Sequence, residues 1–404
     1  MTPWKQTLVV VWLAQFLSMM GFAFGMPFAA YYLQTLGVGD KKELWVAVWS
    51  AATPLTLAVF SPIWGHLADR FGRRVMMLRA YAGGAVVLAL MALVQSPLQL
   101  ILLRLIQGVF TGTVTAAQTM VAVTAPRERS GTALGILSTS IFGGSMVGAS
   151  LGGMLAEAFG YRASYIFAGI LLLLSLLLTV FGTREDPVTK QLPPQALEVD
   201  EPKPERSPLT GGAVPILLLI FFMAEVRQFD SPFVPLLVQE INGGKLEGSA
   251  LLSGILSTAG AIAGMLAGFF LGRLADRRHP PAIAKFCSLA ASLIVLPQAI
   301  ITTFIPLVAA RFGLAFFAGG LDPVFLIWLA KVTPDERRGA IFGWAATAKS
   351  IGWIVAPLIG GVIAAYLGIR AIFYVEAVMF VLLVPCIAWA VRRIGRARGP
   401  AAEA

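Results

Sequence analysis

Three ionisable residues interrupt a long apolar segment in the middle of the chain, and their chemistry sets the first hypothesis. The segment FMAEVRQFDSPF, residues 222–233, contains Glu225, Arg227 and Asp230. Arg227 and Asp230 are three residues apart and share one face of a helix, so we expect them to pair. Glu225 lies about 140° round the helix from Asp230 and needs a different partner. The basic residues of other apolar segments that could serve are Lys349, Arg104 and Arg311.

Carboxyl groups in such a setting can bind and release protons. An ionisable side chain within a membrane helix costs about 2.5–3.5 kcal/mol, so it is a candidate for function by default. Burial favours the protonated carboxyl and a nearby cation favours the ionised one, so one conformation can load a proton and another can release it. We expect Asp230 or Glu225 to be this group, with Asp322 next, whereas Glu376 is expected to be peripheral.

The composition places the chain in a membrane. Of its 404 residues 57% are apolar and 13% are charged, and the mean hydropathy of +0.80 lies outside the range of soluble globular proteins. Cys287 and Cys386 lie in apolar segments, which fits packing better than a disulfide or a metal site. No phosphate-binding Walker sequence occurs, nor a nucleophile and base at a recognisable spacing. We therefore predict neither an ATP-driven pump nor an enzyme, and no metal or cofactor.

Twelve apolar segments are long enough to cross a bilayer as helices, since a crossing takes about 20 residues. The first segment is too long for a cleavable signal peptide and is expected to remain as a transmembrane helix. We predict an all-α integral membrane protein with spans at 6–35, 44–66, 75–95, 98–122, 131–157, 162–182, 213–239, 249–272, 282–303, 306–330, 339–366 and 370–391.

The basic residues sort by loop. With a cytoplasmic N-terminus, 22 of the 31 Lys and Arg residues fall on the cytoplasmic side, five fall outside, and four lie within the spans. The positive-inside rule therefore predicts a multi-pass protein with both termini in the cytoplasm. It also accounts for the net charge of +10 as membrane topology, so nucleic-acid binding is not expected.

The two halves of the chain repeat one another. Residues GHLADR at 65–70 return as GRLADR at 272–277, and PRERSG at 126–131 returns as PDERRG at 334–339, at offsets of 207 and 208. A charged, proline-rich segment without apolar periodicity, residues 183–212, separates the first six predicted helices from the last six. We predict an N-terminal six-helix bundle at 1–182, a cytoplasmic linker at 183–212 and a C-terminal bundle with a short basic tail at 213–404. An even helix number makes the repeats parallel, an arrangement that places a binding site at their interface.

Three motifs resemble those of the major facilitator superfamily. GHLADRFGRR at 65–74 is similar to its cytoplasmic loop signature, RLIQG at 104–108 to its fourth-helix signature, and GGSMVGASLGG at 143–153 to the fifth-helix signature of drug/proton antiporters. The resemblance covers essentially the whole chain and extends to bacterial twelve-helix multidrug exporters. One departure is Ala149, which stands where that signature has a proline and a helix bend.

The resemblance implies roles for the loop and for the fifth helix. The loop would latch the two halves on the cytoplasmic side, with the first copy the better candidate because the second copy has lost the later glycine and arginines; the alternative is a topology signal with a helix cap. The residues of this expected latch are Gly65, Asp69, Arg70, Gly72, Arg73, Arg74 and Asp276. The fifth-helix glycines Gly144, Gly148, Gly152 and Gly153 would permit close helix contact, or serve a specific role in blocking leak.

The resemblance also implies proton coupling. It places a proton-linked arginine at Arg104, which adds to Asp230, Glu225, Arg227 and Asp322 as expected coupling residues. Several drug antiporters carry their acid in the first helix, where this chain has only glutamines as large polar groups, so the proton carrier stays open.

The expected function is export of small lipophilic compounds from the bacterial cytoplasm across the inner membrane, by alternating access and in exchange for protons. The helix-seven acids could attract cationic substrates, and Arg227 and Lys349 could equally hold an anionic group. Flexible and aromatic side chains suit promiscuous apolar pockets, although any one of them could instead face lipid. The expected pocket residues are Met19, Phe22, Met26, Phe229, Phe233, Phe316 and Trp328. Export of one specific metabolite or siderophore is an alternative, and a transport-dead receptor or scaffold is another; we expect a monomer in the lipid bilayer.

Overall fold

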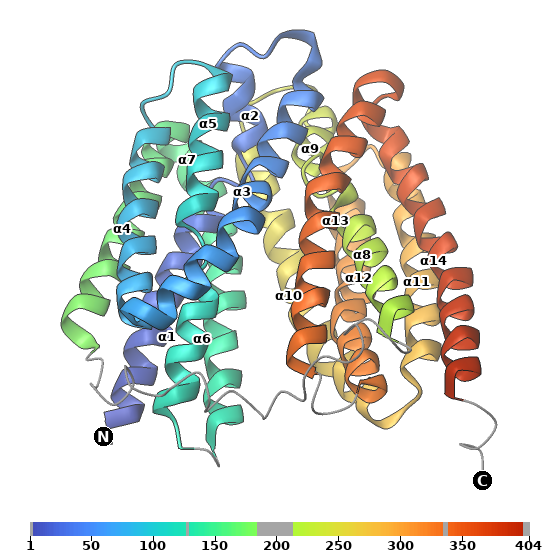
Figure 1. Cartoon of the computed structure of the whole chain (residues 1–404). Helices are drawn as coiled ribbons and strands as arrows, with labels where there is room; N and C mark the ends of the chain where they lie inside the picture. The colour runs from blue at the N-terminus through green and yellow to red at the C-terminus, as the bar shows by residue number, and fades with distance from the viewer. Residues whose placement is uncertain (1–2, 127–128, 184–212, 334–337, 399–404) are drawn as a thin grey trace. The chain divides into compact units, whose positions relative to one another are not determined.

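The computed structural model describes residues 3–126, 129–183, 213–333 and 338–398 and is shown in Figure 1. Within these residues the regular structure is entirely helical. Among the described residues, ten helical spans are long and apolar enough to cross a membrane, and one of them, Pro97–Thr124, joins two shorter helices. The predicted all-α membrane class is confirmed, whereas nearly all of the predicted linker lies outside the described residues.

The chain forms two compact units, and each is described by itself. Unit 1 holds the described residues up to Thr183 together with Val238–Thr258, and unit 2 holds Ala213–Leu237 together with the described residues from Ala259 onward. The predicted bundle boundaries stay predictions.

Unit 1 contains the first seven α-helices. They are α1 (Pro3–Ala23), α2 (Ala29–Thr35), α3 (Lys42–Phe71), α4 (Arg73–Met91), α5 (Pro97–Phe110), α6 (Thr113–Thr124) and α7 (Ser130–Gly182), with a 3₁₀ turn at Gly39–Lys41. Helix α1 packs along α7 over the most extensive helix contact in the described chain, and α7 also covers α4.

Unit 2 is built around α8 (Ala213–Phe229). This helix contacts α12 (Phe304–Val332), α13 (Arg338–Leu367) and α14 (Ile369–Arg398), and α11 (Pro280–Val295) packs against α12 and α14. Helices α9 (Val234–Ile241) and α10 (Ser249–Arg277) each pass from one unit into the other, and a 3₁₀ turn at Leu296–Ala299 follows α11. Polar side chains on α8 can therefore contact side chains of three other helices.

The twelve predicted crossings are consistent with these helices, because one long helix covers two predicted spans and some predicted spans are each divided into two shorter helices. Helix α7 has 53 residues, about 80 Å at 1.5 Å per residue, which is far longer than a bilayer core of about 30 Å. Its backbone leaves helical geometry at Gly160, where φ is +82°. The predicted spans 131–157 and 162–182 correspond to its two parts.

Three spans that we predicted as continuous are interrupted. The first breaks between Ala23 and Ala29, around Pro27; the fourth breaks at Gly112, whose φ is +112°; and the seventh breaks between Phe229 and Val234, around Pro232. Proline lacks the N–H that a helix bonds, and glycine adopts positive φ without strain. The length and hydropathy of an apolar segment, from which the spans were predicted, do not reveal such local breaks in a helix.

Candidate functional site

The first helix of the seventh predicted span is α8, and it ends just before Asp230, one of the acids selected from the sequence. Asp230 follows the last residue of α8, and its carbonyl oxygen accepts hydrogen bonds from the backbone N–H groups of Phe233 and Val234 at 2.8 and 3.2 Å. The break thus fixes the backbone at Asp230, while α8 holds the carboxyl against the helices around it.

Asp230 forms an ion pair with Arg311 of α12. The Asp230 side chain is only 3% exposed, and Arg311 also donates to Gln298 Oε1 at 3.4 Å. We predicted that Asp230 would pair with Arg227, which is wrong. That prediction assumed a helix continuing through Asp230, and the chain leaves helical geometry there.

Glu376 completes this cluster from α14. It is buried, and its carboxyl lies within hydrogen-bonding reach of Asp230. Its Oε2 atom has no hydrogen-bond partner among the described residues. Our prediction that Glu376 is peripheral is wrong, although its place within an apolar helix was a sufficient signal. We call Asp230, Arg311 and Glu376 the carboxyl cluster: Arg311 forms an ion pair with Asp230, and Glu376 lies beside that pair.

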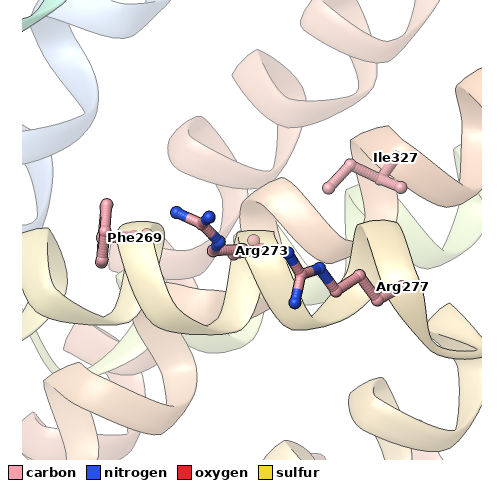
Figure 2. Close-up of a pocket in the computed structure, with 6 residues that line it drawn as sticks. Phe269, Arg273, Arg277 and Ile327 are labelled. Carbon is pink, nitrogen blue, oxygen red and sulfur yellow. The ribbon is translucent and has the colours of Figure 1, made fainter.

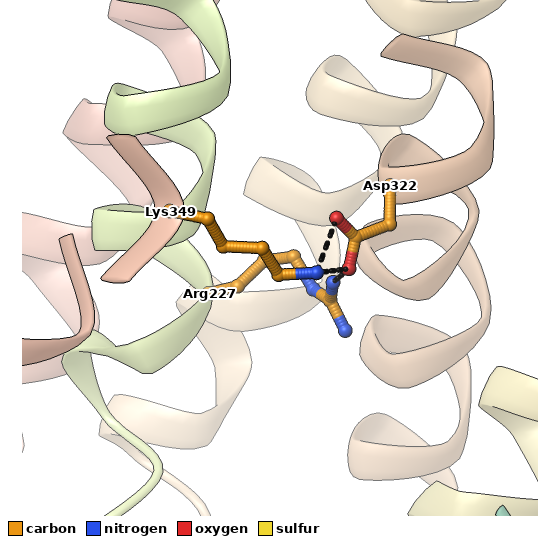
Figure 3. A network of polar contacts seen from close by, with 3 residues as sticks. All are labelled: Arg227, Asp322 and Lys349. Carbon is orange, nitrogen blue, oxygen red and sulfur yellow. Dashed lines mark hydrogen bonds and ion pairs between the residues drawn. The ribbon is translucent and has the colours of Figure 1, made fainter. Parts of the chain in front are cut away.

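A second ionic group joins α8, α12 and α13, and Figure 3 shows its three side chains pointing toward one another. Arg227 forms an ion pair with Asp322. Lys349 Nζ lies 2.9 Å from both carboxylate oxygens of Asp322 and 5.2 Å from the Trp353 ring centroid. We call Arg227, Asp322 and Lys349 the cationic cluster, because two cations share one carboxylate.

Glu225 remains apart from both clusters. It is buried on α8, and it forms no ion pair within the part of the chain that the structure describes. Two partners considered for it, Arg311 and Lys349, are engaged with Asp230 and Asp322. Its backbone is closely covered, because a Cβ at Gly352 of α13 would lie 3.0 Å from Glu225 N.

Arg104 is a buried cation in unit 1. Its Nη1 donates to Gln107 Oε1 at 2.7 Å, and its guanidinium stacks on Trp49 at 3.8 Å. Gly108 lets α3 approach, since a Cβ there would meet Thr53 O at 2.4 Å. The RLIQG motif thus supplies an arginine, an internal acceptor for it, and space for the helix that carries the tryptophan.

The fifth-helix glycines make a packing seam on α7. A Cβ at Gly144 or Gly148 would meet a carbonyl oxygen of α1 at 2.4 or 2.2 Å, and one at Gly152 would meet the oxygen of the residue just after α1 at 2.2 Å. A Cβ at Gly153 would meet Ala250 O of α10 at 2.4 Å. The close helix contact that these glycines were expected to permit is present within unit 1.

The motif at 65–74 covers the end of α3, a one-residue turn and the start of α4. Helix α3 ends at Phe71, α4 begins at Arg73, and Gly72 between them has φ +95°. Arg74 Nη2 donates to Val180 O of α7 at 2.7 Å, and Arg70 lies over the Phe71 ring. Gly65 has open space beside it, and Arg73 begins α4. The side chains of Asp69 and Asp276 lie outside the described residues, so their expected role stays a prediction.

The expected pocket residues differ in accessibility. Phe229 and Phe233 are buried where α13 meets them at Gly360, and Trp328 is buried and stacked on Phe325. The others of the set are half-buried or exposed, namely Met19, Phe22, Phe316 and Met26. Their role in substrate binding stays a prediction.

A shallow groove of about 530 Å³ follows α10 in unit 2. Figure 2 shows Arg273 and Arg277 on successive turns of α10, with Phe269 and Ile327 beside them. No group of three potential metal ligands occurs among the described residues.

Comparisons with known proteins agree with the architecture. The model of the Major Facilitator Superfamily matches residues 11–301 and 216–404. The multi-drug resistance efflux pump PmrA homolog of Lactococcus lactis is 33% identical over 371 residues, covering 91% of this chain and 90% of that protein. The multidrug resistance protein MdtG of Dickeya zeae is 33% identical over 387 residues, covering 93% and 91%.

Solved structures show the same fold at low identity. A bacterial homologue of the human lysosomal transporter Spinster, inward-facing and occupied, has a TM-score of 0.75 at 17% identity and covers 97% of this chain and 98% of its own. The nucleoside transporter NupG has a TM-score of 0.79 at 14% identity, with 95% and 99% covered. The chain therefore belongs to the Major Facilitator Superfamily, whose members are membrane transporters and not enzymes.

Proposed function

We propose that this chain exports lipophilic drugs from the bacterial cytoplasm in exchange for protons, with both termini on the cytoplasmic side. Relatives named as multidrug efflux pumps align over more than nine-tenths of the chain. The excess of Lys and Arg in one set of loops supports the orientation. A proton gradient would drive the exchange, without a cofactor.

The carboxyl cluster carries the proposal of proton coupling. If Asp230 and Glu376 were both ionised, the cluster with Arg311 would hold one uncompensated negative charge in a buried site, which is costly. One bound proton removes that charge and supplies a hydrogen bond between the two carboxyl groups. Two acids facing one guanidinium therefore form a site for one exchangeable proton, and this is the observation on which the proposal rests.

Release of that proton requires a second state in which the negative charge is stabilised. Entry of water would provide it, because ions are far better solvated in water than in protein. Arg311 and Asp322 both lie on α12, and Arg227 near the end of α8 is three residues before Asp230, so a shift of either helix alters both clusters. Glu225 and Asp322 are the further groups that could carry a proton, and Arg104, which stays protonated, could bias the charge of an acid.

The test is drug-driven proton movement in proteoliposomes with a pH-sensitive dye inside. We expect Glu376→Gln and Asp230→Asn each to abolish proton movement while drug binding persists, because a neutral amide cannot carry the proton. Glu225→Gln and Asp322→Asn are compared in parallel, and Glu247→Gln, an exposed acid outside the clusters, is the matched control. If the four variants at Glu376, Asp230, Glu225 and Asp322 all still coupled drug transport fully to proton movement, the assignment of the proton to these acids would be overturned.

A further inference from the structure

The cationic cluster carries more positive than negative charge. Arg227 and Lys349 both bind the single carboxylate of Asp322, so the group holds a net charge of +1 when all three are ionised. An unbalanced charge at membrane depth is costly unless a counter-ion or water meets it.

The remaining acids of α8 and its neighbours do not supply that counter-charge. In the carboxyl cluster Asp230 forms an ion pair with Arg311, and Glu376 lies beside that pair. Glu225 is two residues from Arg227, which places it on roughly the opposite side of α8. Within the part of unit 2 that the structure describes, the spare positive charge is therefore left for something that enters from outside.

The cationic cluster is accessible, and the described residues leave some of its hydrogen-bond donors unused. The side chains of Arg227, Lys349 and Asp322 are 32%, 28% and 22% exposed, in contrast to 3% for Asp230. A guanidinium offers five N–H donors and an ammonium three, whereas Asp322 has only two oxygens to accept them. An incoming acid group could join Asp322 or replace it.

An apolar surface lies beside these donors. Trp353 stands one helical turn after Lys349 on α13, its ring centroid is 5.2 Å from Lys349 Nζ, and it is 37% exposed. A ligand that places an acid group on Lys349 and Arg227 would lay its body along this ring. The site thus matches a compound that is anionic at one end and flat and apolar at the other.

We infer that the cationic cluster with Trp353 binds the acid group of amphiphilic organic anions, carboxylates or sulfonates, and that these are exported substrates. Asp322 acts as a built-in competitor, holding the two cations together when no ligand is bound. The inference rests on the proposed export function and gives it a substrate class.

The test is calorimetric binding to the full-length protein in lipid nanodiscs, with naphthalene-2-sulfonate and its neutral counterpart naphthalene-2-sulfonamide. We expect the sulfonate to bind more tightly, and Lys349→Gln and Arg227→Gln each to weaken it by about tenfold or more with little change for the sulfonamide. Asp322→Asn should tighten sulfonate binding, since it removes the competitor. Lys349→Arg should keep the site, and Lys285→Gln, a lysine of α11 outside the cluster, is the control.

Equal binding of the two probes would overturn the inference. So would weaker sulfonate binding in Asp322→Asn, which is the result expected of an ion network that only supports the fold. If cationic dyes such as ethidium drive proton movement while the sulfonate neither binds nor moves, the export function stands and the anion site is rejected. If no compound drives proton movement but the sulfonate binds as described, the site stands and proton exchange is rejected.

Discussion

At the scale of single residues, Arg311 is the cation that balances the buried carboxylate of Asp230. It faces Asp230, and Glu376 lies against that same carboxyl. Removing one partner of a buried ion pair typically costs about 3–5 kcal/mol, because the other charge is left buried without compensation. We expect Arg311→Gln to lower the free energy of unfolding by an amount in this range, measured by denaturant titration of the purified protein.

The matched control removes the charge that Arg311 balances. In the double variant Arg311→Gln with Asp230→Asn, no charged member of the pair is left, so most of the stability should return. If instead the losses of stability in the two single variants simply add, the two residues do not interact and Arg311 does not balance the charge of Asp230.

The pairing of these residues is the part of the site that sequence could not supply. Hydropathy and charge were enough to select Glu225, Arg227, Asp230 and Asp322 as unusual, because an ionised group in an apolar helix is visible in one dimension. Which acid meets which base depends on how α12, α13 and α14 surround α8. Helix spacing paired Arg227 with Asp230, and this error comes from reasoning along one helix where the contacts lie across several. The expectation that Glu376 is peripheral failed because the sequence does not show which helix faces Asp230.

At the scale of elements, the glycines of α7 determine how closely α1 can approach. A Cβ at Gly148 would lie 2.2 Å from Met20 O and 2.7 Å from its Cα, and backbone atoms cannot move aside as a flexible side chain can. We expect Gly148→Ala to reduce stability by about 1–3 kcal/mol, the usual cost of overpacking. Thermal unfolding of the purified protein measures it.

The same helix offers a control glycine. A Cβ at Gly135 would meet nothing within 4 Å, and alanine is favoured over glycine inside helices by about 0.5–1 kcal/mol. Gly135→Ala should therefore be neutral or slightly stabilising. Equal losses of stability in Gly148→Ala and Gly135→Ala would show that α7 needs glycines for helix flexibility and not for the close approach of α1.

The helices themselves were largely predictable, and their interruptions were not. Apolar length located the spans because the bilayer sets it. The breaks at Gly112 and near Pro27 and Pro232 each involve one or two residues within an apolar segment, so they scarcely alter the hydropathy on which the prediction relied. The seventh-span break matters most, because it sets the backbone at Asp230.

At the scale of the whole molecule, the internal repeat was the strongest signal in the sequence. Constant offsets of 207 and 208 between matching motifs indicated parallel halves without any knowledge of contacts. Charge does not follow the repeat, since the ionised residues of the seventh span match Leu17, Met19 and Phe22 in the first. A duplicated scaffold in which the seventh span carries ionisable groups and the first does not fits the proposed division of labour, in which unit 2 binds the proton and the ligand.

The two copies of the cytoplasmic loop also differ, and the difference predicts unequal roles in the transport cycle. The first copy turns on Gly72 at φ +95° and is tied to α7 by Arg74, whereas in the second copy α10 ends at Arg277 and α11 begins at Pro280 without a positive-φ glycine. A rigid turn holds an acid in a reproducible place, so a latch that must form once per cycle depends more on the first loop. We expect Asp69→Asn to slow drug export by at least several-fold more than Asp276→Asn, with drug affinity unchanged in both, measured as transport rate at saturating drug and as equilibrium binding. Equal slowing would assign the latch to both halves, and no slowing in either would leave the loops as topology signals alone.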